Sequence, residues 1–287
     1  MKQLIILLLA GVVYACTPAT AQTHEFKEQV KKEFTLSKGA AQSVLAVYNL
    51  NGFIKVEGYS GDKIMVEVER SLSAKDKETL EKGKEEFKLV FEQNADSVVA
   101  YIADPFDTRP NHNRKNRDNR KIEYKFNLNF TIKVPYEMNL CVSTINQGDI
   151  HIKDVTGRLK VNNINGAIAM VNAKGTTDVH TINGNVDINY LVIPPDNSSY
   201  YTLNGNIRIT YPASLSADLQ FKSFNGEFFT DFPDAQALAP EVIKHTEHEG
   251  DKTVYKLDKK SAIRIGKGGK ILKFETFNGN IYIKKQS

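Results

Sequence analysis

A glycine recurs at every ninth position in the middle of the chain, at Gly148, Gly157, Gly166, Gly175 and Gly184. The second and fourth residues after each glycine are mostly apolar, and the residues between them are mostly polar. Side chains two residues apart share one face of a β-strand, so each repeat reads as a short strand with one apolar face. Strands this short cannot bury that face alone, and successive repeats are therefore expected to stack on one another.

The turns that precede these glycines alternate in composition, which adds a second period of eighteen residues. Every second turn is an Asn-Gly pair, and similar pairs recur later in the chain. The Asn-Gly corners are formed by Asn165 and Gly166, Asn183 and Gly184, Asn204 and Gly205, Asn225 and Gly226, and Asn278 and Gly279. We expect them to be structural turns, with asparagine amides that hydrogen-bond to the repeats above and below.

These periods predict an all-β fold. The favoured form is a β-solenoid, a parallel β-helix-like stack of coils of about 18–21 residues, with N-terminal strands and one short helix. In this arrangement the seventh residue after each glycine is predicted to point inward, namely Val155, Ile164, Ala173, Ile182 and Leu191. An antiparallel meander of hairpins, or a partial propeller, is the alternative, because Asn-Gly is also a typical hairpin turn in which both residues tolerate positive φ.

Residues 1–21 are predicted to be a signal peptide, with Lys2 before an apolar run over residues 4–13. Cleavage after Ala21 would give a periplasmic, cell-surface or secreted protein. Acylation of Cys16 would instead give an outer-membrane lipoprotein. The apolar run is too short to remain as a membrane-spanning helix.

The remaining chain is expected to form one continuous domain with two parts. Residues 22–135 form a β-rich region that ends in a strand over 122–134. This region contains a short helix at 75–86, which follows a capping box at Ser73 and Asp76. Residues 136–287 carry the solenoid repeats. Residues 231–251 depart from the period, and residues 277–283 are predicted to close the stack.

A basic loop at residues 104–121 separates the N-terminal strands. It contains two prolines and an excess of positive charge, which indicates an exposed segment. A polyanion contact through Arg114, Lys115, Arg117 and Arg120 is one interpretation, and a solvated insertion is the other. We expect no nucleic-acid partner for an exported protein.

No arrangement of residues indicates catalysis, a cofactor or a metal ion. Asp178 and Asp187 hold the same position in successive half-coils, so they should lie on opposite sheets and not as a catalytic carboxylate pair. His245 and His248 alone are a weak metal signal. After cleavage Cys141 has no disulfide partner and is expected to be a small buried residue.

The run Thr181–Ile188, together with Phe224–Gly226 and Phe277–Gly279, resembles a bacterial putative-adhesin family of exported envelope proteins. The resemblance spans residues 44–285. It implies a β-rich coiled or partly propeller-like fold, an envelope location and an adhesive or surface role, and it carries no catalytic residues over.

The sequence therefore favours a non-catalytic exported cell-envelope protein that acts as an adhesin-like binding or scaffolding module. Its partner would be an envelope or extracellular ligand, with a glycan or an anionic lipid head group as candidates. A carbohydrate-active enzyme on a β-helix and an accessory protein in envelope-stress signalling are the alternatives.

Overall fold

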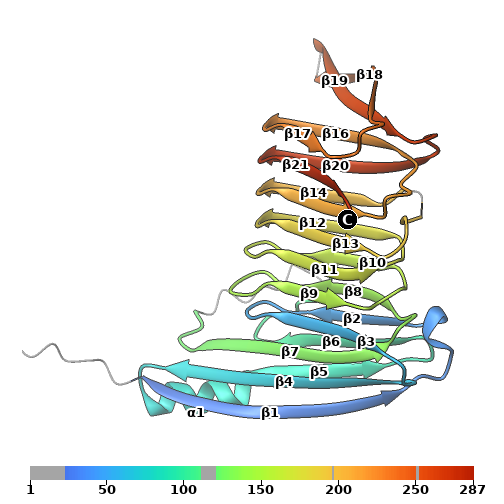
Figure 1. Cartoon of the computed structure of the whole chain (residues 1–287). Coiled ribbons are helices and arrows are strands. Elements are labelled where there is room, and N and C mark those ends of the chain that lie inside the picture. The colour runs from blue at the N-terminus through green and yellow to red at the C-terminus, as the bar shows by residue number, and fades with distance from the viewer. Residues whose placement is uncertain (1–22, 111–120, 196, 250–251) are drawn as a thin grey trace, which may run out of the picture.

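The computed structural model describes residues 23–110, 121–195, 197–249 and 252–287, and between 240 and 260 it describes the backbone alone. The fold is all-β, as predicted, and consists of two large mixed sheets that do not close on each other. Figure 1 shows their strands stacked level upon level, with the N-terminal elements at the bottom.

The described strands divide between a sheet of ten strands and a sheet of eleven. Sheet A runs in the spatial order β1 (His24–Thr35), β4 (Lys63–Ala74), β7 (Lys125–Pro135), β3 (Ile54–Tyr59), β9 (Ile150–Lys153), β11 (Ile168–Ala173), β13 (Val186–Tyr190), β15 (Ile207–Tyr211), β21 (Ile281–Lys285) and β17 (Phe228–Thr230). Sheet B runs in the order β18 (Gln236–Glu249), β19 (Lys252–Ile265), β16 (Ala217–Asn225), β20 (Lys270–Asn278), β14 (Ser199–Asn204), β12 (Thr177–Asn183), β10 (Leu159–Asn162), β8 (Asn139–Ser143), β2 (Val44–Tyr48), β6 (Ser97–Asp104) and β5 (Lys88–Gln93).

From β8 to β15 the chain alternates between the two sheets, and each strand pairs in parallel with the strand two places along. We call a strand of sheet B and the sheet A strand that follows it a layer. Ile168 lies opposite Val186, eighteen residues on, and Val186 lies opposite Ile207, twenty-one residues on. All three side chains are fully buried between the sheets. Parallel pairing of these repeats is incompatible with an antiparallel meander.

The order of the layers departs from the order of the sequence at both ends. β20 and β21 lie between the layer β14–β15 and the layer β16–β17, so β16–β17 is farther out although it comes earlier in the chain. Figure 1 shows the red β20 and β21 below the orange β16 and β17. The prediction that residues 277–283 close the stack is therefore wrong. Similarly, β2 and β3 lie nearer the middle of their sheets than β6 and β7, which come later in the chain.

The N-terminal end is covered by antiparallel strands and by the one α-helix of the described residues. β1 pairs with β4, and β4 pairs with β7, whose inward residues Phe126 to Val134 alternate with polar ones. Helix α1 (Lys77–Glu86) begins after Asp76, whose carboxylate accepts a hydrogen bond from the Thr79 backbone N–H at 2.8 Å. Asp76 is therefore the N-cap, and the predicted capping box with Ser73 as its first residue is wrong, because Ser73 lies in β4. A short 3-10 turn (Ala40–Gln42) precedes β2.

The C-terminal end extends through sheet B alone. The described part of the segment 231–251, which departs from the repeat, contains β18. This strand forms a long antiparallel pair with β19, and β19 pairs with β16. Sheet A ends at the three-residue strand β17. Asp218 in β16 and Arg264 in β19 join these strands through two hydrogen bonds of 2.7 and 2.8 Å.

Candidate functional site

The Asn-Gly corners of successive layers lie in register, and their asparagine side chains form a continuous ladder. Asn183 Nδ2 donates to Asn165 Oδ1 at 2.8 Å, and Asn204 Nδ2 donates to Asn183 Oδ1 at 2.9 Å. The asparagine ladder runs in the spatial order Asn51, Asn146, Asn165, Asn183, Asn204, Asn278 and Asn225. Each interior member is thus bonded to the layers on both sides.

A second polar column lies two residues before each ladder asparagine, with its side chains directed between the sheets. The Thr181 hydroxyl donates to the Gly166 carbonyl at 2.9 Å, and the Thr202 hydroxyl donates to the Gly184 carbonyl at 2.8 Å. The full column consists of Asn49, Thr144, Asn163, Thr181, Thr202, Thr276 and Ser223, each bonded to a glycine carbonyl. These bonds satisfy polar groups that the core would otherwise leave unpaired.

The corner glycines are required by close approach of the layers. Gly184 does not have positive φ, so a left-handed backbone conformation does not explain why this position is a glycine. A Cβ atom at Gly184 would overlap the carbonyl oxygen of Gly166, and one at Gly205 would overlap that of Gly184. Because those atoms belong to fixed backbone, a larger residue cannot be accommodated by moving a flexible side chain.

The predicted inward direction of the seventh residues is wrong at the Asn-Gly corners. Ile164 and Ile182 are half-buried, and Leu191, in a later turn, is 46% exposed. The reason is that Thr181 occupies the interior position, so alternation turns Ile182 to the outer face of sheet B. We define the outer stripe as this column, which comprises Leu50, Ile145, Ile164, Ile182, Leu203, Phe277 and Phe224.

The outer stripe becomes aromatic and most exposed toward the C-terminal end of the stack. Phe277 is 44% exposed and Phe224 is 74% exposed. Their rings are stacked, with centroids 4.8 Å apart and an interplanar angle of 8°. Beside the stripe, His180 and Tyr201 are also stacked, at 4.4 Å. Burial lowers the pKa of His180, which favours its neutral form.

Sheet A carries a different column of outward side chains over the same layers. Asp187 pairs with Arg208 at 3.2 Å, and the Arg208 guanidinium lies 5.9 Å from the ring centroid of Tyr282. Tyr282 in turn stacks on Phe229, which is 41% exposed. The outer faces of the two sheets therefore differ, since this column contains an ion pair and the outer stripe has no charge.

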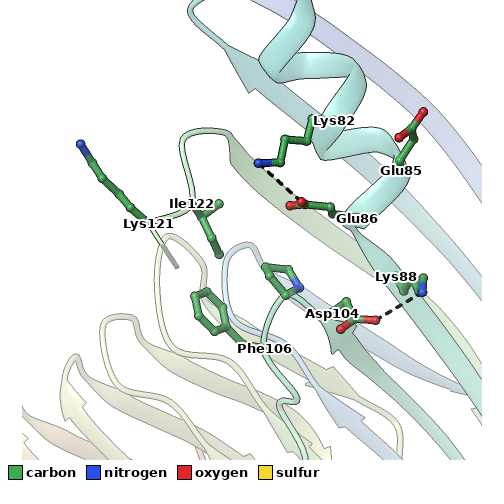
Figure 2. A pocket seen from close by; sticks show the side chains of 9 residues that line it. Lys82, Glu85, Glu86, Lys88, Asp104, Phe106, Lys121 and Ile122 are labelled. Carbon is green, nitrogen blue, oxygen red and sulfur yellow. Dashed lines mark ion pairs between the residues drawn. The ribbon is translucent and has the colours of Figure 1, made fainter. Parts of the chain in front are cut away.

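A cavity of about 410 Å³ lies between α1 and the two ends of the basic loop, at residues 104–106 and 121–122. Phe106 and Ile122 form its apolar part, and Figure 2 shows Lys121 extending away from Phe106. Ion pairs of 3.7 Å between Lys82 and Glu86, and of 3.5 Å between Lys88 and Asp104, occupy its rim. Lysines and carboxylates balance here, so the cavity has no strong preference for an anion. The predicted polyanion residues Arg114, Lys115, Arg117 and Arg120 lie outside the described residues.

The other residues considered for chemistry are dispersed. Asp178 is in β12 of sheet B and Asp187 is in β13 of sheet A, on opposite sheets as expected. No group of three or more metal-ligating side chains occurs among the described residues. The side chains of His245 and His248, and all of Cys16, lie outside that description.

Cys141 is half-buried, on the outer side of β8. Its Sγ lies 3.6 Å from the Tyr48 hydroxyl, so it is less enclosed than predicted. Burial, with a smaller contribution from Cys141, raises the pKa of Tyr48 to about 12. Since the Tyr48 hydroxyl keeps its proton at neutral pH, it can donate or accept in this contact.

Three buried tyrosines form a polar cluster that the sequence pattern did not reveal. The hydroxyls of Tyr190 and Tyr200 are 2.7 Å apart, and the Tyr211 hydroxyl donates to that of Tyr200 at 3.3 Å. Burial raises the pKa of all three well above the ordinary tyrosine value. The three tyrosines occupy inward positions that are aliphatic in other repeats. Period-two alternation predicts that such positions are buried, but it does not predict that their hydroxyls bond to one another.

Comparison with known proteins found that the chain is similar to two solved structures. No protein-family model matches the chain, and no curated protein matches it. A putative cell adhesion protein from Clostridium sporogenes has 11% identity and a TM-score of 0.45, over 91% of this chain and 100% of that one. A putative adhesin from Bacteroides fragilis has 10% identity and a TM-score of 0.32, over 90% of this chain and 97% of that one.

Proposed function

We propose that the chain is a non-catalytic, adhesin-like protein of the cell envelope that binds or scaffolds an envelope or extracellular ligand. The outer stripe is the observation that carries this proposal. Isolated exposed apolar residues are ordinary, whereas a continuous apolar column offers a ligand several contacts at once. Here it continues from layer to layer and ends in two exposed phenylalanines.

The binding surface belongs to a β-solenoid in this proposal. Parallel registers eighteen and twenty-one residues apart support a coil of two strands and two corners. The repeated polar columns support it as well, because each hydrogen-bonds one coil to the next. Such a stack is a rigid support for side chains spaced along one wall.

An enzyme on the same scaffold has no observation in its favour. Glycoside hydrolysis requires two carboxyl groups about 5–9.5 Å apart on either side of the substrate. Asp178 and Asp187 lie on different sheets and are engaged by Ser199 and Arg208 respectively. Both carboxylates therefore serve contacts between layers.

Export through residues 1–21 is part of the proposal, with cleavage after Ala21 or acylation at Cys16 as its two forms. No helix among the described residues is long and apolar enough to cross a membrane. The mass of the mature N-terminus, measured on protein recovered from cell fractions, distinguishes the two forms. An unprocessed chain that remains in the cytoplasm would contradict export.

The binding function is tested on the processed full chain with an array of glycans and matrix proteins. We expect saturable binding to at least one class, without release of reducing ends from any glycan. Absence of binding across the array would contradict a binding role. Release of reducing ends would favour the enzyme.

A further inference from the structure

The outer stripe has dimensions that restrict what can cover it. It crosses seven layers, and strands in a sheet are about 4.8 Å apart, so its length is about 29 Å. It is one side chain wide, or roughly 7 Å, because alternate residues on a strand face are separated by two rises of about 3.3 Å. The resulting area, on the order of 200 Å², is far below the roughly 800 Å² that each partner contributes to a stable dimer. A single extended polymer fits this shape, and a folded partner or a second copy does not.

The borders of the stripe are polar on both sides. On one side lies the asparagine ladder, in which each amide has two N–H donors and an acceptor oxygen with two lone pairs. The ladder bonds use one donor and one lone pair, as at Asn183 and Asn204, so one of each remains at every step. On the other side lie His180 and Tyr201.

This cross-section, apolar in the centre and hydrogen-bonding at the margins, complements a sugar ring. A pyranose presents C–H groups on its face and hydroxyls around its rim. An extended peptide would instead require free backbone partners, and β12, β14 and β20 already pair on both sides. An acyl chain would leave the free amide groups beside it unused.

The charge of the surface selects among glycans. The stripe itself has no ionisable group. In the outward column beside it, Lys222 and Glu275 lie 3.8 Å apart as an ion pair, so their charges balance. This surface does not attract an acidic polymer.

We propose that the outer stripe binds one chain of a neutral glycan lengthwise. Phe277 and Phe224 form the anchoring end, and Leu203 and Ile182 continue the contact along the same sugar chain. The site rests on the proposed binding function and assigns it a ligand class and a position.

The test uses the processed full chain in calorimetric titrations with cello-oligosaccharides and chito-oligosaccharides of increasing length. Charged controls are oligogalacturonates and vesicles containing anionic lipid. We expect affinity for a neutral series to rise with its length, and the double variant F224S/F277S to weaken it by at least about tenfold, equivalent to about 1.4 kcal/mol. The matched control is Phe229→Ser, which removes an exposed stacked aromatic from sheet A and should leave affinity within about twofold.

The outcomes separate this inference from the broader function. Neutral-glycan binding that survives F224S/F277S, or binding of the charged probes alone, overturns the assignment to the outer stripe while the binding role stands. If the wild-type chain binds neither these probes nor any member of the array, the binding role itself is contradicted. Melting curves verify folding of each variant. If the double variant is unfolded, the single change Phe224→Ser decides, because this side chain is 74% exposed.

Discussion

At one corner of each layer the chain passes from sheet B to sheet A, through an Asn-Gly pair in every layer of the asparagine ladder except β8–β9, where Gln147 separates Asn146 from Gly148. At the opposite corner, as between β11 and β12, the chain returns to sheet B. In four layers the Asn-Gly corner joins the strands through two residues only, at 184–185, 205–206, 226–227 and 279–280. The opposite corner varies from three residues at 174–176 to eight at 191–198. The change from a spacing of eighteen residues to one of twenty-one is thus accommodated at the opposite corner and in its flanking strands, while the Asn-Gly corner keeps its length.

The difference follows from what occupies each corner. At the Asn-Gly corner the ladder amides, the buried hydroxyls and the glycine backbones all contact the same positions in the next layer. At the opposite corner Asn172 bonds Asp154 at 2.6 Å, but later layers carry no equivalent pair. Contacts that repeat in every layer fix the length of a turn, whereas a corner without them tolerates insertions.

An insertion of Gly-Ser-Gly at each corner gives the largest expected contrast. After Asn183 it displaces the ladder, the hydroxyl column and the glycine together, and we expect a loss of more than about 4 kcal/mol in the free energy of unfolding. After Leu191, between two residues that are each 46% exposed in the longest opposite corner, the cost of a longer loop should be about 0.6 kcal/mol or less. Urea unfolding measures both, and equal losses would contradict a division between fixed and tolerant corners.

Gly184→Val should destabilise the protein by about 3 kcal/mol, because its side chain would overlap the Gly166 carbonyl in a packed backbone contact. Gly39→Val is the control, since a Cβ there meets nothing within 4 Å, and its effect should stay within about 0.5 kcal/mol. Thermal unfolding compares the two. A melting curve unchanged by Gly184→Val would show that the layers are not in close contact at this corner.

Thr181→Val keeps the shape of a buried side chain and removes its bond to the Gly166 carbonyl. We expect a loss of about 1–2 kcal/mol, because a buried carbonyl loses its side-chain donor. Thr210→Val, on the outer face of β15, should change stability by less than about 0.5 kcal/mol. If both variants have the same unfolding midpoint in urea, the hydroxyl column does not contribute to stability.

Asn183→Ala should have the smallest effect, about 1 kcal/mol, because its two ladder bonds are exposed to water. Asn225→Ala, at the end of the ladder with one such bond, should cost roughly half as much. The ratio is the sensitive measurement, obtained from paired urea titrations. A larger loss at Asn225 than at Asn183 would be inconsistent with additive bonds along the ladder.

The sequence was sufficient for the features that depend on local periodicity. Alternating apolar and polar side chains predicted the strands, and the nine-residue interval predicted one strand in each repeat. The charged segment before Phe87 predicted α1. The direction of Ile182 was not predictable in this way. Only one of the neighbouring residues Thr181 and Ile182 can point inward. Thr181 does so, because its hydroxyl donates a hydrogen bond to the Gly166 carbonyl.

The order of the layers could not be read from the sequence for a related reason. Asn204, Asn225 and Asn278 belong to nearly identical corners, so local patterns do not show which one bonds which. The stacking of Phe277 on Phe224 is one specific contact made by the observed order. Like the outer stripe, it depends on residues far apart in the chain.

The position of β20 and β21 inside β16 and β17 has a consequence for synthesis of the protein. Residues 217–230 emerge from the ribosome before residues 270–285, yet their native partners are the later segment. Until that segment is available, β16 and β17 lack these native partners, and so do the edges of β14 and β15 that β20 and β21 cover in the finished protein.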